Sequence, residues 1–359
     1  MLRLVLCGAI AATALLAAPA SFSSAEAKVY NLKYADIGPP RGPRAGALMW
    51  WAEALESRSK GNIKIKFYWS QSLVKGKATM KAVGSRIADM GTVLGIYHPA
   101  EFPVWNYANT PFLHSDAWVG MRTWFELRQT VPEIKAETDK HKVTILFNNT
   151  TGPVQLLMAK KAVTTVAGLK GMKIRTSGGW THLFKELGAV PVKIGFGELY
   201  AALDRGTIDG TINYTPFVKS YKHYEVACCL TEAAMGQVLG YGIGMNTKLL
   251  NSMPADIRSV VVNTSVEYMD VYARYYIESM EEAQVSLQAG IDGRKVKILK
   301  LSKAEEDKFR AAAASFTIDW KKKISKKGMD PDAILAKIKM VHAKWTKRLN
   351  DKGYPWAPK

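Results

Sequence analysis

Residues 168–216 have the sequence GLKGMKIRTSGGWTHLFKELGAVPVKIGFGELYAALDRGTIDGTINYTP, in which a strand, a glycine turn and a helix are predicted in succession. Residues 172–175 alternate apolar and polar side chains, as a short strand does, and residues 180–187 have helical spacing. Arg175 is therefore predicted at the carboxyl end of a strand, the edge at which open α/β sheets bind ligands. Its guanidinium matches a carboxylate, and the first turn of the next helix favours negative charge. The stretch predicts an anion site; the alternative is a solvated charge at a strand end.

The same stretch contains short phrases in a fixed order, which together resemble the solute-binding receptors of TRAP transporters, the DctP type. The phrases are GLKGMKIR at 168–175, LGAVPV at 187–192, GELYAAL at 197–203, GTIDG at 206–210 and Asn213-Tyr214. The resemblance extends from about residue 28 to residue 350. It implies an α/β, two-lobed periplasmic-binding-protein fold with a mostly parallel sheet in each lobe, a ligand cleft between the lobes and a long helix that spans both.

Two lobes are also expected from the chain itself. A length of 359 residues can bury two cores, and strands at 29–35 and 63–69 flank a helix at 45–58, as in a β-α-β unit. Residues 254–289 contain no internal Gly or Pro and predict one long helix, the alternative being two shorter helices that meet at an unmarked break. The expected organisation is lobe I at 28–152, completed by about 240–275; lobe II at 153–239, completed by about 290–320; the long helix at 253–290; and a basic helical tail at 321–359.

The first 27 residues have the features of a secretory signal peptide. Arg3 precedes an apolar run over 4–20, and Ala25-Glu26-Ala27 offers a small-x-small cleavage site. The mature protein is expected in the periplasm.

The part of the chain after the signal peptide contains two cysteines, Cys228 and Cys229. Adjacent cysteines cannot link distant parts of a chain, so two buried thiols are expected. The alternative is an intermolecular or redox role.

The net charge of +19 does not predict nucleic-acid binding. Many of the lysines lie in the tail, spaced along helix-like segments, and no nucleic-acid-binding motif accompanies them. A solvated basic face is therefore expected, which can attract acidic solutes or an acidic membrane partner only weakly at physiological salt.

The expected binding residues surround Arg175. Many members of the resembling family have a second arginine where this chain has Val154, so a second carboxylate contact is not expected, and the neighbouring Gln155 is a candidate neutral donor. In a related branch of the family, a bound metal ion holds the acid, and that branch has Glu-Trp where this chain has Asn213-Tyr214. The amide of Asn213 is a weaker metal ligand than a carboxylate. Neither a metal nor another cofactor is therefore expected. Asn213 is expected to reach the ligand, while Tyr214 and Trp180 either stack on it or belong to the core. The full set is Arg175, Asn213, Gln155, Tyr214, Trp180 and Asn149.

The resemblance implies an extracytoplasmic receptor, expected to be monomeric, that closes on an organic carboxylate and delivers it to a TRAP permease in the membrane. A single arginine with several aromatic residues favours a monocarboxylate with an aromatic or hydroxylated body. An exported enzyme is the rival class, but the six histidines lack ligand spacing, no G-x-S-x-G, H-E-x-x-H or C-x-x-C motif occurs, and no catalytic residue is expected. A third class is a ligand-sensing partner of a membrane receptor.

Overall fold

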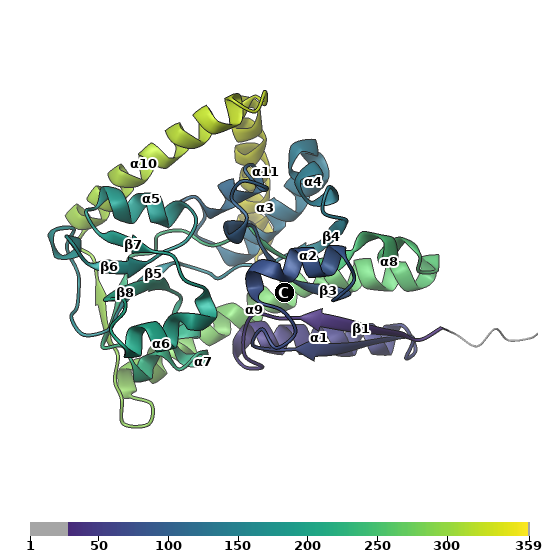
Figure 1. The fold of residues 1–359 in the computed structure, drawn as a ribbon, viewed down its shortest axis with the longest axis horizontal. Coiled ribbons are helices and arrows are strands. Elements are labelled where there is room, and N and C mark those ends of the chain that lie inside the picture. The colour runs from purple at the N-terminus through teal and green to yellow at the C-terminus, as the bar shows by residue number, and fades with distance from the viewer. Residues whose placement is uncertain (1–27, 358–359) are drawn as a thin grey trace, which may run out of the picture.

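The computed structural model describes residues 28–357, which form two β-sheets with helices packed around them (Figure 1). The expected signal peptide lies outside the described residues. The first sheet has the order β2-β1-β3-β10-β4, and only β10 runs against its neighbours. We call this sheet and its helices lobe I. Its strands are β1 (Tyr30–Ala35), β2 (Ile63–Tyr68), β3 (Met90–Leu94), β4 (Val143–Asn148) and β10 (Tyr241–Asn246).

The second sheet, with its helices, makes lobe II. Its order is β11-β9-β5-β8-β6-β7, and only β5 runs against its neighbours. Both sheets are thus mostly parallel in strand direction, which confirms the expected fold class. The strands are β5 (Gln155–Met158), β6 (Lys173–Arg175), β7 (Val190–Val192), β8 (Gly210–Asn213), β9 (Cys229–Glu232) and β11 (Lys297–Lys300).

Helices fill the connections between the strands of each sheet. The first begins at Gly42 rather than at the expected residue 45, because Pro43 is tolerated in a first turn, where its missing N–H costs no hydrogen bond. Lobe I contains α1 (Gly42–Arg58), α2 (Thr79–Gly84), α3 (Ala117–Thr130), α4 (Pro132–Asp139) and α8 (Thr247–Asn251), and lobe II contains α5 (Gly179–Glu186), α6 (Leu199–Asp204) and α7 (Thr215–Ser220).

A single helix of 35 residues, α9 (Ala255–Ala289), connects the two lobes. It packs against α1, α3 and β4 of lobe I and against α7 and β11 of lobe II, and Figure 1 shows it running beneath both lobes beside α1 and α7. Tyr268, Tyr272 and Tyr276 follow one another at helical spacing and are all buried, and the Tyr272 hydroxyl donates to the Thr150 carbonyl oxygen over 2.6 Å. The long spanning helix is confirmed, and the alternative of two shorter helices is wrong.

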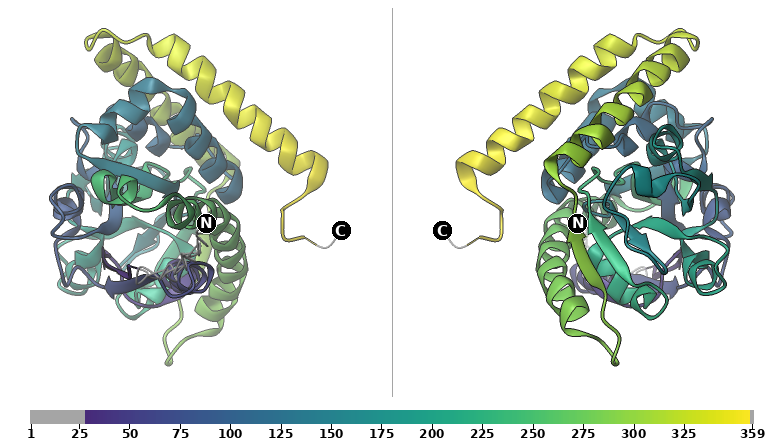
Figure 2. Two further views of the ribbon diagram at one scale, coloured as in Figure 1. Left: turned by 90° about the vertical axis from the view of Figure 1, so that its right-hand side faces the viewer. Right: turned by 90° about the vertical axis from the view of Figure 1, so that its left-hand side faces the viewer.

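The carboxyl-terminal tail also touches both lobes. Helix α10 (Lys303–Ser325) packs on α5 of lobe II and α11 (Pro331–Lys352) packs on α3 of lobe I, and Figure 2 shows them as a hairpin on the outside of the molecule. The Trp320 indole donates to the Pro103 carbonyl oxygen over 2.8 Å, and the Tyr354 hydroxyl donates to Asp116. No helix among residues 28–357 is both long and apolar enough to cross a membrane.

Cys228 and Cys229 differ from their expected state. The structure joins the two sulfur atoms in a disulfide between adjacent residues, at the start of β9. The expectation of two buried thiols is therefore wrong. A bond between neighbours closes no loop between distant segments, so both lobes depend on their hydrophobic cores for stability.

We expect acid to destabilise the fold, because two buried imidazoles must stay neutral. Burial lowers the pKa of His114 and of His223 to about 3, and His114 accepts a hydrogen bond from the Trp124 indole. An unfolded chain binds these protons below about pH 6.5, so stability is complete above that pH and falls as the pH drops toward 3. At pH 5 the expected loss for His114 is about 2 kcal/mol.

Denaturant unfolding at pH 7 and pH 5 measures this loss. His114→Gln should remove about 2 kcal/mol of the pH dependence, whereas His182→Gln, at a partly exposed position, should not. An unchanged pH dependence in His114→Gln would contradict the assignment.

Candidate functional site

Arg175 is the last residue of β6 and is almost completely buried, with 1% of its surface exposed. Its Nε donates to the Ile194 carbonyl oxygen over 3.0 Å, and its guanidinium carbon lies 5.6 Å from the centre of the Phe196 ring. Gly178, with a φ of 57°, turns the chain into α5 directly afterwards. The strand end and the turn together hold the guanidinium at the junction of the lobes.

No carboxylate among the described residues lies within ion-pair distance of Arg175. Burial lowers the pKa of its guanidinium, and the electrostatic influence of Tyr97, Tyr214 and Glu198 opposes that shift. A buried charge without a counter-ion costs free energy unless another group satisfies it. Arg175 is therefore suited to receive an anion from outside the chain.

A narrow cavity of about 30 Å³ lies against Arg175, between the lobes. This volume holds only one or two water molecules. An organic molecule can enter only if the lobes separate or the side chains move. Lobe I and the crossing segments contribute Ile37, Arg44, Leu94, Ile96, Tyr97, Thr151, Val238 and Tyr241, and lobe II contributes Arg175, Ser177, Phe196, Tyr214, Phe217 and Tyr221.

Four polar atoms on residues that line this cavity are buried without a hydrogen-bond partner among the described residues. They are Nε and NH1 of Arg44, Oγ of Ser177 and the hydroxyl of Tyr241, of which NH1 of Arg44 still forms an ion pair with Asp36. Buried polar groups nearly always have a partner, either in the protein, in water or in a ligand. The cavity is thus lined with donors and acceptors that a polar ligand would satisfy.

Aromatic rings form much of the wall on the lobe II side. The ring centre of Phe196 lies 5.7 Å from that of Tyr214 and 5.0 Å from that of Tyr221, and Phe217 packs against both tyrosines. Burial raises the pKa of Tyr214 to about 12, so its hydroxyl stays protonated near neutral pH. The wall can therefore pack against an apolar ring or chain and donate a hydrogen bond.

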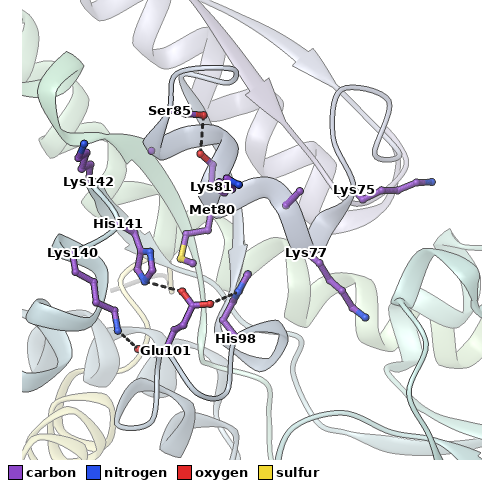
Figure 3. A pocket seen from close by; sticks show the side chains of 12 residues that line it. Lys75, Lys77, Met80, Lys81, Ser85, His98, Glu101, Lys140, His141 and Lys142 are labelled. Atoms are coloured by element: carbon purple, nitrogen blue, oxygen red, sulfur yellow. Dashed lines mark hydrogen bonds and ion pairs between the residues drawn. The ribbon is translucent and has the colours of Figure 1, made fainter.

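A larger hollow of about 630 Å³ lies on lobe I (Figure 3). Its single carboxylate, Glu101, is 3.3 Å from Nδ1 of His98 and 2.9 Å from Nε2 of His141. No residue of lobe II lines it, so its shape does not depend on how the lobes meet. We therefore place the candidate site at Arg175. Five lysines border the hollow on lobe I: Lys75, Lys77, Lys81, Lys140 and Lys142.

Comparison with known proteins identifies the family. A family model for bacterial extracellular solute-binding proteins, family 7 (DctP), matches residues 34–323. The chain belongs to this family. The function class expected from the sequence, an extracellular solute-binding receptor of the DctP type, is confirmed by this match.

Relatives of this family-7 receptor have diverged widely in sequence. A solute-binding protein of Sulfitobacter sp. (strain NAS-14.1) is 32% identical over 173 residues, which make up 45% of this chain and about half, 51%, of that protein. The C4-dicarboxylate-binding periplasmic protein DctP of Rhodobacter capsulatus is 26% identical over 85% of this chain and 89% of that protein. A TRAP solute-binding protein from Rhodoferax ferrireducens T118, crystallised with copurified benzoate, has a TM-score of 0.79 at 22% identity and covers 89% of this chain and 99% of its own. That likeness shows a shared two-lobed fold.

Of the six binding residues expected in the family-7 receptor, Arg175 and Tyr214 line the interlobe cavity and the other four do not. Asn213 lies within hydrogen-bond distance, 2.9 Å, of Nδ1 of the buried His223, and its amide oxygen accepts from the Tyr214 N–H. Gln155 accepts from the N–H groups of residues 233 and 234. These amides hold neighbouring protein groups instead of facing the cavity.

The remaining two expected residues are also engaged elsewhere. The Trp180 indole donates to the Met235 carbonyl oxygen over 2.9 Å, which corresponds to the core alternative considered for this residue. Asn149 donates to the Tyr268 hydroxyl over 3.3 Å. Among the described residues, no group of three or more His, Cys, Asp or Glu is placed to hold a metal ion.

Sequence reasoning missed Arg44, the second guanidinium at the cavity. A signal was present, because Arg44 lies in the first turn of α1, next to Pro43, where a positive charge opposes the helix dipole. Ser177, Phe196 and Tyr241 were also missed. They come from separate segments, and no local pattern distinguishes them from packing residues.

We expect Arg175→Met to stabilise the ligand-free protein, because it removes a buried charge that has no counter-ion and keeps a long side chain. The expected gain in the free energy of unfolding is about 1–3 kcal/mol. Denaturant unfolding of extensively dialysed protein measures it, with the exposed Arg205→Met as the matched control. A clear loss of stability in Arg175→Met would show that the guanidinium supports the fold instead of awaiting a ligand.

Proposed function

We propose that this receptor binds an organic monocarboxylate in the interlobe cavity, with the carboxylate on Arg175. The observation that carries the proposal is the buried guanidinium of Arg175, which has no carboxylate partner among the described residues. A planar carboxylate accepts two parallel hydrogen bonds from a guanidinium and supplies the missing charge. The unpartnered hydroxyl of Ser177, two residues further along the chain, is a second donor on the same side.

The aromatic wall favours a ligand with an aromatic or hydroxylated body. Phe196, Tyr214 and Tyr221 present ring faces and edges, and rings pack with a gain beyond simple burial. The Rhodoferax relative binds benzoate, an aromatic monocarboxylate. The proposed ligand for this chain is of the same chemical kind.

Binding is proposed to proceed by closure of the lobes. In this structure the lobes already meet closely: a Cβ atom added to Gly38 of lobe I would lie 2.1 Å from the Tyr221 hydroxyl of lobe II, and Nε of Arg41 donates to the Ser220 carbonyl oxygen. An acid enters when these contacts open. Closure then removes water from the carboxylate and the guanidinium, which strengthens their attraction.

A receptor fits the cavity better than an enzyme does. The residues that line it include no His, Asp, Glu, Cys or Lys, so it offers no obvious general base beside Ser177. The proposal therefore includes delivery of the acid to the membrane subunits of a TRAP permease by a monomeric periplasmic protein. The periplasmic name of the Rhodobacter relative supports this location.

A thermal-shift screen of residues 28–359 against aliphatic and aromatic mono- and dicarboxylates tests the proposal. A ligand at 100 times its Kd should add about 2.7 kcal/mol of stability. We expect Arg175→Lys to weaken binding by about 100-fold, because lysine keeps the charge but loses the planar fork. Arg205→Lys, on the exposed surface of lobe II, should leave affinity unchanged.

Two results would contradict the proposal. One is a screen in which no carboxylate stabilises the wild-type protein. The other is an Arg175→Lys variant that binds the selected acid as tightly as the wild type, which would remove Arg175 from the site.

A further inference from the structure

The two guanidiniums at the interlobe cavity differ in how their charge is balanced. Arg44, from α1 of lobe I, is 2% exposed, and its NH1 atom lies 2.6 Å from Oδ1 of Asp36. Its NH2 atom donates to the Pro39 carbonyl oxygen over 2.8 Å. Nε of Arg44 has no partner among the described residues. Arg44 therefore faces the cavity with a donor to spare but with its charge already compensated.

Asp36 is held in place by groups that stabilise its charged form. The Gly38 N–H donates to Oδ1 over 2.6 Å and the Thr92 hydroxyl donates to Oδ2 over 3.1 Å. Burial raises the pKa of Asp36, and the Arg44 guanidinium is the strongest influence that opposes this shift. Three donors on two oxygen atoms favour an ionised carboxylate.

The charge of the cavity follows from these contacts. Arg175 contributes one uncompensated positive charge, and the pair of Arg44 and Asp36 contributes none. No other charged residue lines the cavity. A ligand with one negative charge neutralises the closed site, whereas a ligand with two leaves a buried negative charge beside Asp36, at a high energetic cost.

We propose that the pair of Asp36 and Arg44 acts as a specificity device that accepts a hydroxyl or carbonyl oxygen at the lobe I end of the cavity and rejects a second carboxylate. This inference rests on the proposed function of Arg175. The substrate class is thereby narrowed to hydroxy and oxo monocarboxylates. Asp36 does not line the cavity, so it acts by positioning and neutralising Arg44.

The hydrogen-bond groups at this end suit an oxygen that carries no charge. Nε of Arg44 can donate to a hydroxyl or carbonyl oxygen, and the unpartnered Tyr241 hydroxyl can donate to it or accept from it. Family membership does not decide between monocarboxylates and dicarboxylates as ligands, because one relative is named for C4-dicarboxylates and another holds benzoate. The pairing of Arg44 with Asp36 favours the monocarboxylates.

Matched acids test the inference in the wild-type protein. Isothermal titration would compare 3-hydroxybenzoate with benzene-1,3-dicarboxylate, and 4-hydroxybutyrate with succinate, because each pair differs only in the group at the far end. We expect the hydroxy acid of at least one pair to bind more tightly than its dicarboxylate by about 30-fold or more.

Asp36→Asn tests the mechanism. The amide retains an oxygen for the Gly38 N–H but leaves Arg44 uncompensated, so the preference for the hydroxy acid should shrink by about tenfold or reverse. In the double variant Asp36→Asn, Arg44→Gln the two side chains again carry no net charge. The increase in affinity for dicarboxylates that we expect in Asp36→Asn should therefore be lost. A purely structural role of Asp36 would weaken both acids equally and leave their ratio unchanged.

The outcomes separate the two proposals. If no carboxylate binds, the proposed function fails. If wild-type protein binds hydroxy acids and dicarboxylates equally well, or if the ratio is unchanged in Asp36→Asn, the specificity device is refuted while the receptor function stands. Should Asp36→Asn fail to fold, the double variant decides: it must still prefer the hydroxy acid, and a preference for the dicarboxylate would overturn the inference.

Discussion

A buried positive charge that the protein does not neutralise is the constraint on which the rest of this structure depends. Arg175 ends a strand, lies at the junction of two lobes and is 1% exposed, yet no carboxylate among the described residues forms an ion pair with it. Removing water from a guanidinium costs free energy, and in a two-lobed fold this cost differs between the open and the closed state. In the proposed closure, water reaches the charge when the lobes separate, and a bound anion takes the place of that water when they meet. The free energy of closure is thereby tied to the presence of a ligand, which is the thermodynamic requirement for a receptor that closes on its substrate.

The connections between the lobes must allow that closure without loss of the fold. Two extended crossings link the sheets, between β4 and β5 and between β9 and β10, and α9 and the α10–α11 hairpin span both lobes from outside. The Thr150 carbonyl, in the first crossing, accepts from Tyr272 in the middle of α9. If the lobes open and close as proposed, the helix held at this crossing is a natural fulcrum, about which the lobes would rotate while each sheet keeps its own register.

Local features of the chain were predictable because short-range physics decides them. The alternation at 172–175 and the glycine turn after it placed Arg175 at a strand end, and the uninterrupted helical spacing of 254–289 indicated one long helix, which the structure contains. The opposite faces of the cavity were not predictable in this way. Arg44 and Arg175 are separated by 131 positions in the sequence, and only the closed arrangement of the lobes brings both to one cavity. Asn213 and Gln155, which were also expected at the ligand, bond to other protein groups here, because a polar side chain near a binding residue serves equally well to satisfy buried backbone or a buried imidazole.

This chain has Val154 where many members of the family have a second arginine. The presence of Arg44 at the cavity changes what that replacement implies for the ligand. From the sequence, one missing arginine suggested that only one guanidinium would contact the ligand. The structure contains a second guanidinium from another segment, but Asp36 already balances its charge. If the carboxylate binds Arg175 as proposed, the charge of the ligand follows from the number of uncompensated arginines at the cavity and not from the total number. By that measure this cavity is suited to a single negative charge, and it reaches this state by pairing one cation within lobe I and leaving the other, in lobe II, for the ligand to neutralise.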